Sequence, residues 1–262
     1  MRITRNTIQK MYQNGEKIAI LTCYDACFAT LIENAGIDIL LVGDSLGNVL
    51  QGNDTTLPVT LSDMEYHTRC VAQGVKNALI MTDMPFGTFQ TTPSRAFKNA
   101  AKLLAAGAHM VKIEGGRAIA DTVQFLTQRG IPVCAHIGLT PQSIHQLGGY
   151  KLQGKSESEA NLLLEDAMIL ERAGASMLLM ELVPAVLAKK ITKALSIPTI
   201  GIGAGPDCSA QVLVLHDMLG IYPTSAKFNQ NFMIGAHSIE DAVKRYIKAV
   251  KSEEFPGTDH QY

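Results

Sequence analysis

The chain lacks long hydrophobic runs, clusters of basic residues and paired cysteines, and each absence excludes a class of protein. Apolar runs such as Ile37–Val42 end at charged residues, well short of the ~18 residues that a membrane-spanning helix needs. The first sixteen residues alternate polar and apolar side chains without a continuous apolar stretch, so they do not resemble a secretory signal. We therefore predict a cytoplasmic protein with no membrane partner.

Charge and cysteine content narrow the function classes further. The net charge is −1 and no run of five or more basic residues is present, so nucleic acid is not expected as a partner. None of the five cysteines forms a C-x-x-C motif, which is typical of reduced, buried thiols. The H-E-x-x-H motif is absent, so a zinc site is not expected. Residues 43–46 spell the GDSL start of an esterase motif, but the D-x-x-H that accompanies it is missing.

Short apolar runs recur along the chain and alternate with helical patterns. The runs are rich in Ile, Leu and Val with little alternation, as strands buried on both faces of a parallel sheet should be. We predict eight strands at Lys17–Cys23, Ile37–Val42, Ala78–Thr82, Met110–Ile113, Val133–Ala135, Met177–Met180, Thr199–Ile202 and Val212–Leu215. We predict helices at Ala26–Ala35, Leu61–Gln73, Pro93–Ala106, Ile119–Arg129, Glu157–Ala173, Pro184–Leu195 and Ser238–Val250.

This alternation predicts an α/β fold whose parallel sheet closes into a single (β/α)8 TIM barrel. Such a barrel needs roughly 250 residues, and the chain has 262 with no Pro-, Gly- or Ser-rich linker. We expect residues 1–262 to form one domain. Residues 1–16 would be an N-terminal helical cap, and residues 253–262 a mobile tail or an arm between subunits.

Acidic residues follow four of the predicted strands: Asp44, Asp83, Glu114 and Glu181. Because TIM-barrel active sites lie at the C-terminal ends of the strands, these acids should converge on one rim. A single acid at such a place is usually a helix cap or a turn residue. Four together repel one another unless a cation neutralises them, and Mg²⁺ prefers oxygen ligands of this kind. The pattern favours a magnesium site, with Asp44 and Asp83 on neighbouring strands.

Basic side chains accompany the acids. Lys112 and Glu114 lie two residues apart on one strand, so both face the barrel interior, where they form either an ion pair or part of the site. Beside a metal, Lys112 would neutralise an anionic substrate and Glu114 could hold a metal-bound water. His136 ends the fifth strand, and the long segment Gly138–Ser158 that follows is a candidate lid.

Long motifs at these positions resemble those of the ketopantoate hydroxymethyltransferase family. They read VGDSLGNVLQGNDTTLPVTLSDMEYHTRCV, ALIMTDMPFG, GAHMVKIEGG, VCAHIGLTPQS, GGYKLQG, ELVP and IPTIGIGAG. The resemblance covers nearly the whole chain, from about Thr7 to the tail. Motifs of this length are far more specific than a short glycine pattern.

The resemblance implies transfer of a hydroxymethyl group from 5,10-methylenetetrahydrofolate to the 2-oxo acid 3-methyl-2-oxobutanoate, through a Mg²⁺-stabilised enolate. The product is 2-dehydropantoate, in the first committed step of pantothenate and coenzyme A synthesis. A homo-oligomer, a decamer, is also implied. The implied roles are metal binding for Asp44, Asp83 and, through water, Glu114; oxo-acid binding for Ser45, Lys112 and His136; and the catalytic base for Glu181.

Two alternatives remain open. Other Mg²⁺-dependent barrels that act on 2-oxo acids, of the phosphoenolpyruvate mutase or isocitrate lyase type, also place acids at strand ends. They would turn over without folate, and isocitrate lyases would carry a K-K-C-G-H-like loop that this sequence lacks. A barrel that has lost activity would show a broken acid set, whereas all four acids are present.

Overall fold

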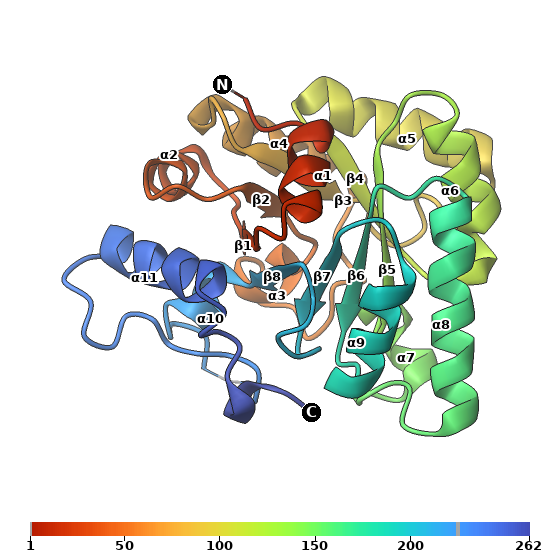
Figure 1. Ribbon diagram of the computed structural model, residues 1–262. Helices are drawn as coiled ribbons and strands as arrows, with labels where there is room; N and C mark the ends of the chain where they lie inside the picture. The colour runs from red at the N-terminus through yellow and green to blue at the C-terminus, as the bar shows by residue number, and fades with distance from the viewer. Residues whose placement is uncertain (1, 224–225) are drawn as a thin grey trace.

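The computed structural model describes residues 2–223 and 226–262. Its eight parallel strands close into a barrel in sequence order, and β8 pairs with β1 (Figure 1). The predicted (β/α)8 fold class is therefore confirmed. The strands are β1 (Ile18–Thr22), β2 (Ile39–Val42), β3 (Leu79–Asp83), β4 (Met110–Glu114), β5 (Val133–Gly138), β6 (Met177–Glu181), β7 (Thr199–Ile202) and β8 (Ala210–Leu213).

Helices surround the barrel, as Figure 1 shows. The α-helices are α1 (Arg5–Gln13), α2 (Ala26–Asn34), α3 (Leu46–Val49), α4 (Leu61–Gly74), α5 (Pro93–Ala106), α6 (Ala120–Thr127), α7 (Ile144–Leu147), α8 (Glu157–Arg172), α9 (Ala185–Ala194), α10 (Leu215–Met218) and α11 (Ile239–Lys251). Short 3₁₀ turns lie at η1 (Arg117–Ile119), η2 (Pro141–Ser143) and η3 (Thr258–His260).

Local sequence explains where several helices begin. Thr60 and Asp63 form a capping box at the start of α4, and α5 has Thr92 as its cap followed by a proline in its first turn. Asp25, which directly follows β1, caps α2 by accepting a hydrogen bond from the Phe28 N–H at 2.9 Å. That strand-end acid therefore has the ordinary capping role.

Strand register sets the order of side chains around the rim. Asp83 of β3 pairs with Lys112 of β4, and Glu114 of β4 pairs with His136 of β5. Gly138 of β5 in turn pairs with Glu181 of β6. Because strand side chains alternate between the two faces of a sheet, Lys112 and Glu114 both reach the same side of β4.

The eighth strand differs from the prediction. It spans Ala210–Leu213 rather than Val212–Leu215, and the apolar run continues into the short helix α10, which carries His216 and Asp217. The Leu215 N–H donates to the Thr22 hydroxyl at 2.8 Å, which ties the start of α10 to β1. A buried run of this kind fits a strand or a helix equally well in sequence.

The two ends of the chain pack against the barrel. Helix α1 lies at the N-terminal end, where Tyr12 donates to the Leu195 carbonyl and Ile8 is buried. Residues 253–262 do not extend as a mobile tail or an arm. Phe255 is buried, 5.5 Å from the Phe232 ring centroid to centroid, and burial of this ring helps to hold the segment against the barrel.

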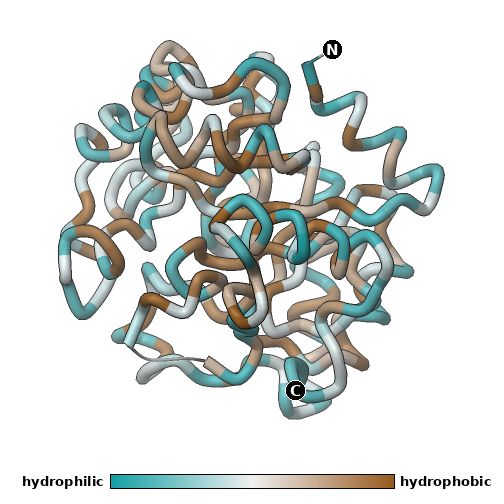
Figure 2. Tube along the Cα trace, turned by 90° about the vertical axis from the view of Figure 1, so that its left-hand side faces the viewer, coloured by the Kyte–Doolittle hydropathy of each residue, from teal (hydrophilic) through white to brown (hydrophobic). Residues whose placement is uncertain are grey.

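Hydrophobic residues run through the middle of the fold, and hydrophilic residues dominate the outer loops (Figure 2). The strands form the centre of this core, because nearly all of their residues are buried. Within residues 2–223 and 226–262, no helix combines the length and apolarity that crossing a bilayer requires. The cytoplasmic location stays a prediction.

Candidate active site

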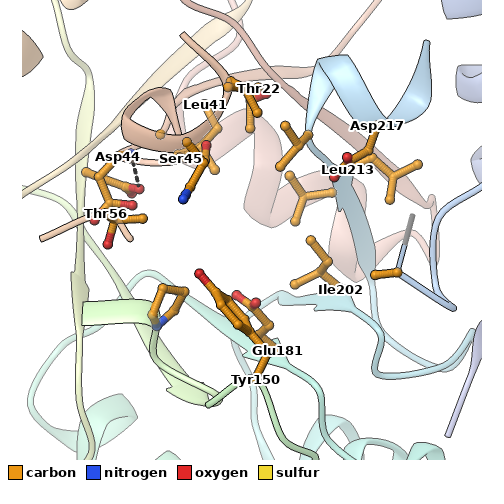
Figure 3. A pocket seen from close by; sticks show the side chains of 18 of the residues that line it. Thr22, Leu41, Asp44, Ser45, Thr56, Tyr150, Glu181, Ile202, Leu213 and Asp217 are labelled. Atoms are coloured by element: carbon orange, nitrogen blue, oxygen red, sulfur yellow. Dashed lines mark hydrogen bonds between the residues drawn. The ribbon is translucent and has the colours of Figure 1, made fainter. Parts of the chain in front are cut away.

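The seven residues singled out from the sequence lie in one cavity at the C-terminal ends of the strands. Its volume is about 660 Å³, a size typical of small-molecule sites. Figure 3 shows Asp44 and Ser45 on one side of the cavity and Glu181 across from them. The lining includes Asp44, Ser45, Asp83, Lys112, Glu114, His136 and Glu181. The structure thus brings together the whole predicted set.

Three buried carboxylates surround one buried ammonium. Lys112 Nζ lies 3.1 Å from Asp83 Oδ1 and 3.7 Å from Glu114 Oε1. Asp83 Oδ2 accepts a hydrogen bond from the Asp44 backbone N–H at 3.0 Å, which joins the ends of β2 and β3. Lys112 therefore forms ion pairs and also lines the cavity, and its role in a functional site stays a prediction.

The charges in this cluster do not cancel. Burial, followed by the charges of Asp83 and Glu114, raises the pKa of Asp44 well above its usual range. Burial alone would lower the pKa of Lys112, but Asp83 and Glu114 raise it above the ordinary lysine value, so the ammonium stays protonated. One cation faces three acids, and Asp44 is the one of them that has no direct ion pair with Lys112, although the Lys112 charge still lowers its pKa in part.

His136 connects the cluster to Glu181. Its Nδ1 lies 3.3 Å from Lys112 Nζ and 3.5 Å from Glu114 Oε1, and its Nε2 lies 3.4 Å from Glu181 Oε2. Burial and then the Lys112 charge lower the pKa of His136, so the ring is neutral. An ammonium can only donate, so Nδ1 accepts and the Nε2–H faces Glu181.

Glu181 has the properties of a proton acceptor. Burial, followed by the charge of Glu114, raises the pKa of Glu181 to about 8. A carboxylate with such a pKa holds a proton far more readily than an ordinary glutamate does at neutral pH. Glu181 therefore combines a place in the cavity with a proton affinity suited to general-base work.

Ser45 is held by a residue that the sequence analysis missed. The Tyr24 hydroxyl and Ser45 Oγ lie 2.8 Å apart, and the tyrosine is buried at the end of β1. Gly43 leaves room for this serine, because a Cβ added at Gly43 would lie 2.8 Å from Ser45 Oγ. The Tyr24-Asp25 pair was visible at a strand end, but nothing in the sequence distinguished its tyrosine.

Gln142 is a second residue that the sequence analysis missed. It lies in η2, within the segment predicted as a lid, and it is buried. Its side-chain amide donates to Asp44 Oδ2 at 2.8 Å and to the Met84 carbonyl at 3.0 Å. Its backbone N–H donates to Glu114 Oε2 at 3.0 Å. The first part of this segment therefore covers the acids in a fixed position, because Gln142 donates hydrogen bonds to Asp44, to Glu114 and to the Met84 carbonyl just after β3.

The acid cluster fits a hard divalent cation that keeps some coordination positions open for water and substrate oxygens. Asp83 Oδ1 and Glu114 Oε1 are buried without a hydrogen-bond donor of good geometry. Among the described residues, no group of three His, Cys, Asp or Glu side chains could hold a metal ion by itself. Mg²⁺ is commonly bound through one or two carboxylates plus water and substrate oxygens, so Asp44 and Asp83 suit Mg²⁺ better than a closed zinc site.

Solved structures show the same fold at low sequence identity. Phosphoenolpyruvate phosphomutase from Streptomyces platensis subsp. rosaceus superimposes with a TM-score of 0.63 at 14% identity, covering 83% of each chain. For 2,3-dimethylmalate lyase, a member of the PEP mutase/isocitrate lyase superfamily, the TM-score is 0.59 at 18% identity, covering 81% of each chain. The barrel therefore has the fold of that superfamily.

Sequence comparison extends over the full length. The family model described as ketopantoate hydroxymethyltransferase matches residues 2–258. The 3-methyl-2-oxobutanoate hydroxymethyltransferase of Nitrosospira multiformis is 69% identical over 263 residues, and that of Chromobacterium violaceum 60% identical over 263 residues, each with full coverage of both chains. That of Thiobacillus denitrificans is 57% identical over 262 residues, again with full coverage. The chain therefore belongs to the ketopantoate hydroxymethyltransferase family.

Proposed function

We propose that this chain carries out the hydroxymethyl transfer of its family in the cavity described above, with Mg²⁺ held at the acid cluster. Ketopantoate hydroxymethyltransferase activity in pantothenate biosynthesis follows from family membership along the whole chain. The substrates are the 2-oxo acid 3-methyl-2-oxobutanoate and 5,10-methylenetetrahydrofolate. The assignment of individual residues to steps is the part that the geometry supports.

The acid cluster and Lys112 suit an anionic oxo acid. Asp44 and Asp83 would hold the metal directly, and Glu114 through a water molecule. The bound ion supplies positive charge that stabilises negative charge developing on the keto oxygen. The Lys112 ammonium remains protonated and can pair with the substrate carboxylate, as charge-assisted hydrogen bonds favour. Ser45, fixed by Tyr24 at 2.8 Å, offers a further hydroxyl.

Glu181 is the proposed base, and its position carries the assignment. It faces the acid cluster across the cavity, and its pKa of about 8 makes its carboxylate form a stronger base than that of an ordinary glutamate. His136 Nε2 lies 3.4 Å from Glu181 Oε2, which places the neutral ring directly beside the carboxylate without a hydrogen bond of good geometry. Glu181 takes the proton from C3 of the oxo acid, and the electron pair left on C3 attacks the methylene carbon of the folate.

The bonds in the transfer balance with one water molecule. The methylene carbon is bonded to two folate nitrogens, so one of these C–N bonds breaks as the new C–C bond to C3 forms, and the other nitrogen still holds the carbon. Water then replaces the folate nitrogen on the carbon, which leaves a hydroxymethyl group on the product and releases tetrahydrofolate. Of the two protons that the freed folate nitrogens need, one is the C3 proton held by Glu181 and the other comes from the water.

Proton-exchange NMR tests this proposal. The C3 proton of 3-methyl-2-oxobutanoate should exchange in D₂O with enzyme and Mg²⁺, without folate, and 2-dehydropantoate should form only when 5,10-methylenetetrahydrofolate is added. Glu181→Gln should bind Mg²⁺ and the oxo acid but show no exchange. Normal exchange in that variant would assign the base to another group.

A rival activity of the phosphoenolpyruvate mutase or isocitrate lyase type would give turnover without folate. The structural likeness to such enzymes supports a shared fold only, since identity is below 20%. The resemblance also predicts a homo-oligomer, a decamer. Large exposed apolar side chains such as Val186, at 83% exposure, and Ile234, at 77%, are consistent with further burial in an assembly. Size-exclusion chromatography with light scattering measures the mass of the assembly directly.

A further inference from the structure

The cavity is larger than the oxo acid requires. The acid has about eight non-hydrogen atoms, whereas cavities in this range enclose drug-sized ligands, and this one holds about 660 Å³. The polar residues of the proposed transfer gather at one end. The remaining space must therefore receive the second substrate, and its lining shows which part of that molecule fits there.

The other end of the cavity is apolar and contains one carboxylate. In Figure 3, Ile202 and Leu213 lie between Glu181 and Asp217, and Asp217 is on the side opposite Asp44. Phe228 and Asn229 complete this end of the lining. Apolar walls with a few fixed polar groups are the usual environment of a flat heteroaromatic ring.

Asp217 is a half-buried acceptor, and no described residue forms a salt bridge with it. Burial raises the pKa of Asp217 to about 6, a hydrogen bond from Asn229 lowers it in part, and no charged side chain contributes to the shift. The remaining oxygen of the same amide, Asn229 Oδ1, is buried without a hydrogen-bond partner. Asn229 Oδ1 therefore lacks a donor among the described residues, and Asp217 beside it has spare acceptor capacity; an unmet buried acceptor costs free energy unless a ligand supplies an N–H group.

We propose that Asp217 and Asn229 bind the amino-pyrimidinone edge of the pterin ring of the folate co-substrate. This inference rests on the proposed function. The pterin edge presents N–H donors at N3 and at the 2-amino group, and a carboxylate can accept two parallel bonds from such a pair. Ile202 and Leu213 contact the ring faces. The opposite side of the ring, which carries N5 and the methylene carbon, then points toward Glu181 and the oxo acid.

A second carboxylate in the lining makes the proposal specific. Asp54 also lines the cavity, but it is exposed. It lies in the loop between α3 and α4, two residues before Thr56. If the pterin bound at that end, Asp54 would be the acceptor and the methylene carbon would approach from the opposite direction. The two positions can be separated by equivalent Asp→Asn substitutions.

Steady-state kinetics of Asp217→Asn with 5,10-methylenetetrahydrofolate tests the assignment. Loss of the charged acceptor should raise the KM for the folate about tenfold to hundredfold. The KM for 3-methyl-2-oxobutanoate and its Mg²⁺-dependent C3 exchange in D₂O should stay unchanged. Asp121→Asn, an exposed acid on α6, is the matched control and should leave all three values unchanged.

Two results would overturn the assignment while leaving the proposed function intact. One is a folate KM within twofold of the parent in a folded Asp217→Asn variant that still exchanges the C3 proton. The other is a large folate defect in Asp54→Asn instead. If Asp217→Asn does not fold, Asn229→Ala gives the same test through the amide, with titration calorimetry of tetrahydrofolate in the presence of Mg²⁺ and oxo acid. Failure of C3 exchange in the unmodified enzyme would instead refute the proposed function.

Discussion

The hydrogen bonds of Gln142 allow a quantitative prediction about metal affinity. Its amide donates to Asp44 Oδ2 at 2.8 Å and to the Met84 carbonyl at 3.0 Å. Gln142→Leu keeps the size of the side chain and its backbone bond to Glu114 but removes both donors. A hydrogen bond to a charged group contributes about 1.5–3 kcal/mol, so the Mg²⁺ concentration at half-maximal activity should rise about tenfold to hundredfold.

The direction follows from protonation of Asp44. The amide bond lowers the pKa of Asp44, against burial and the neighbouring acids that raise it. Without that bond the pKa rises further, so at neutral pH a proton competes more strongly with Mg²⁺ for the carboxylate. The defect should therefore shrink as the pH is raised, and it should be overcome by excess Mg²⁺.

The assay is C3 exchange of the oxo acid in D₂O over a Mg²⁺ titration at several pH values. Gln153→Leu is the matched control, because Gln153 belongs to the same segment but its side-chain amide donates to the Lys151 carbonyl rather than to an acid of the cluster. Circular dichroism would check that both variants are folded. An unchanged Mg²⁺ requirement in folded Gln142→Leu would refute the reasoning, since Asp44 would then not be a ligand that depends on this amide.

Three further outcomes are expected. Asp83→Ala should abolish Mg²⁺-dependent exchange while circular dichroism shows that the barrel stays folded; full activity would show that Asp83 is not a metal ligand. The exchange rate of the unmodified enzyme should rise with pH, pass half its maximum near pH 8 and level off above it, because Glu181, whose pKa is raised to about 8, must lose its proton to act as base; a rate that falls over pH 6–8 would contradict this. Glu33→Gln should lower the melting temperature at pH 7 by about 2–4 °C per kcal/mol lost, because the Glu33 carboxylate accepts backbone N–H bonds from Lys76, Asn77 and Ala78. Those bonds lower the pKa of Glu33, so this stabilisation disappears as the pH falls below 4 and the two melting temperatures should converge.

The barrel and the acid set could be predicted from sequence because both depend on short-range patterns. Apolar runs without alternation indicate strands buried on both faces, and a spacing of two residues places Lys112 and Glu114 on one side of β4. Once the strands are identified, the geometry of a parallel barrel brings their C-terminal residues to one rim. No knowledge of the loops is required for that step.

The parts that were missed depend on contacts between distant segments. Gln142 acts on Asp44 across 98 positions of sequence, and its place follows from how one loop folds back rather than from any local pattern. The packing of residues 253–262 has the same origin, because Phe255 meets Phe232 and Tyr246 from other segments. The boundary of β8 was wrong because apolar residues continue from the strand into α10.

The join between β7 and β8 is the least extensive in the barrel. Two residue pairs are in register there, compared with four between β6 and β7, and the seven residues between the strands include no helix to cover the junction. Gentle warming should loosen this junction before the rest of the barrel opens. Leu213 and Asp217 follow it directly, whereas the acid cluster is anchored on β2 to β6. A mildly heated enzyme would therefore bind the folate weakly while it could still remove the C3 proton of the oxo acid.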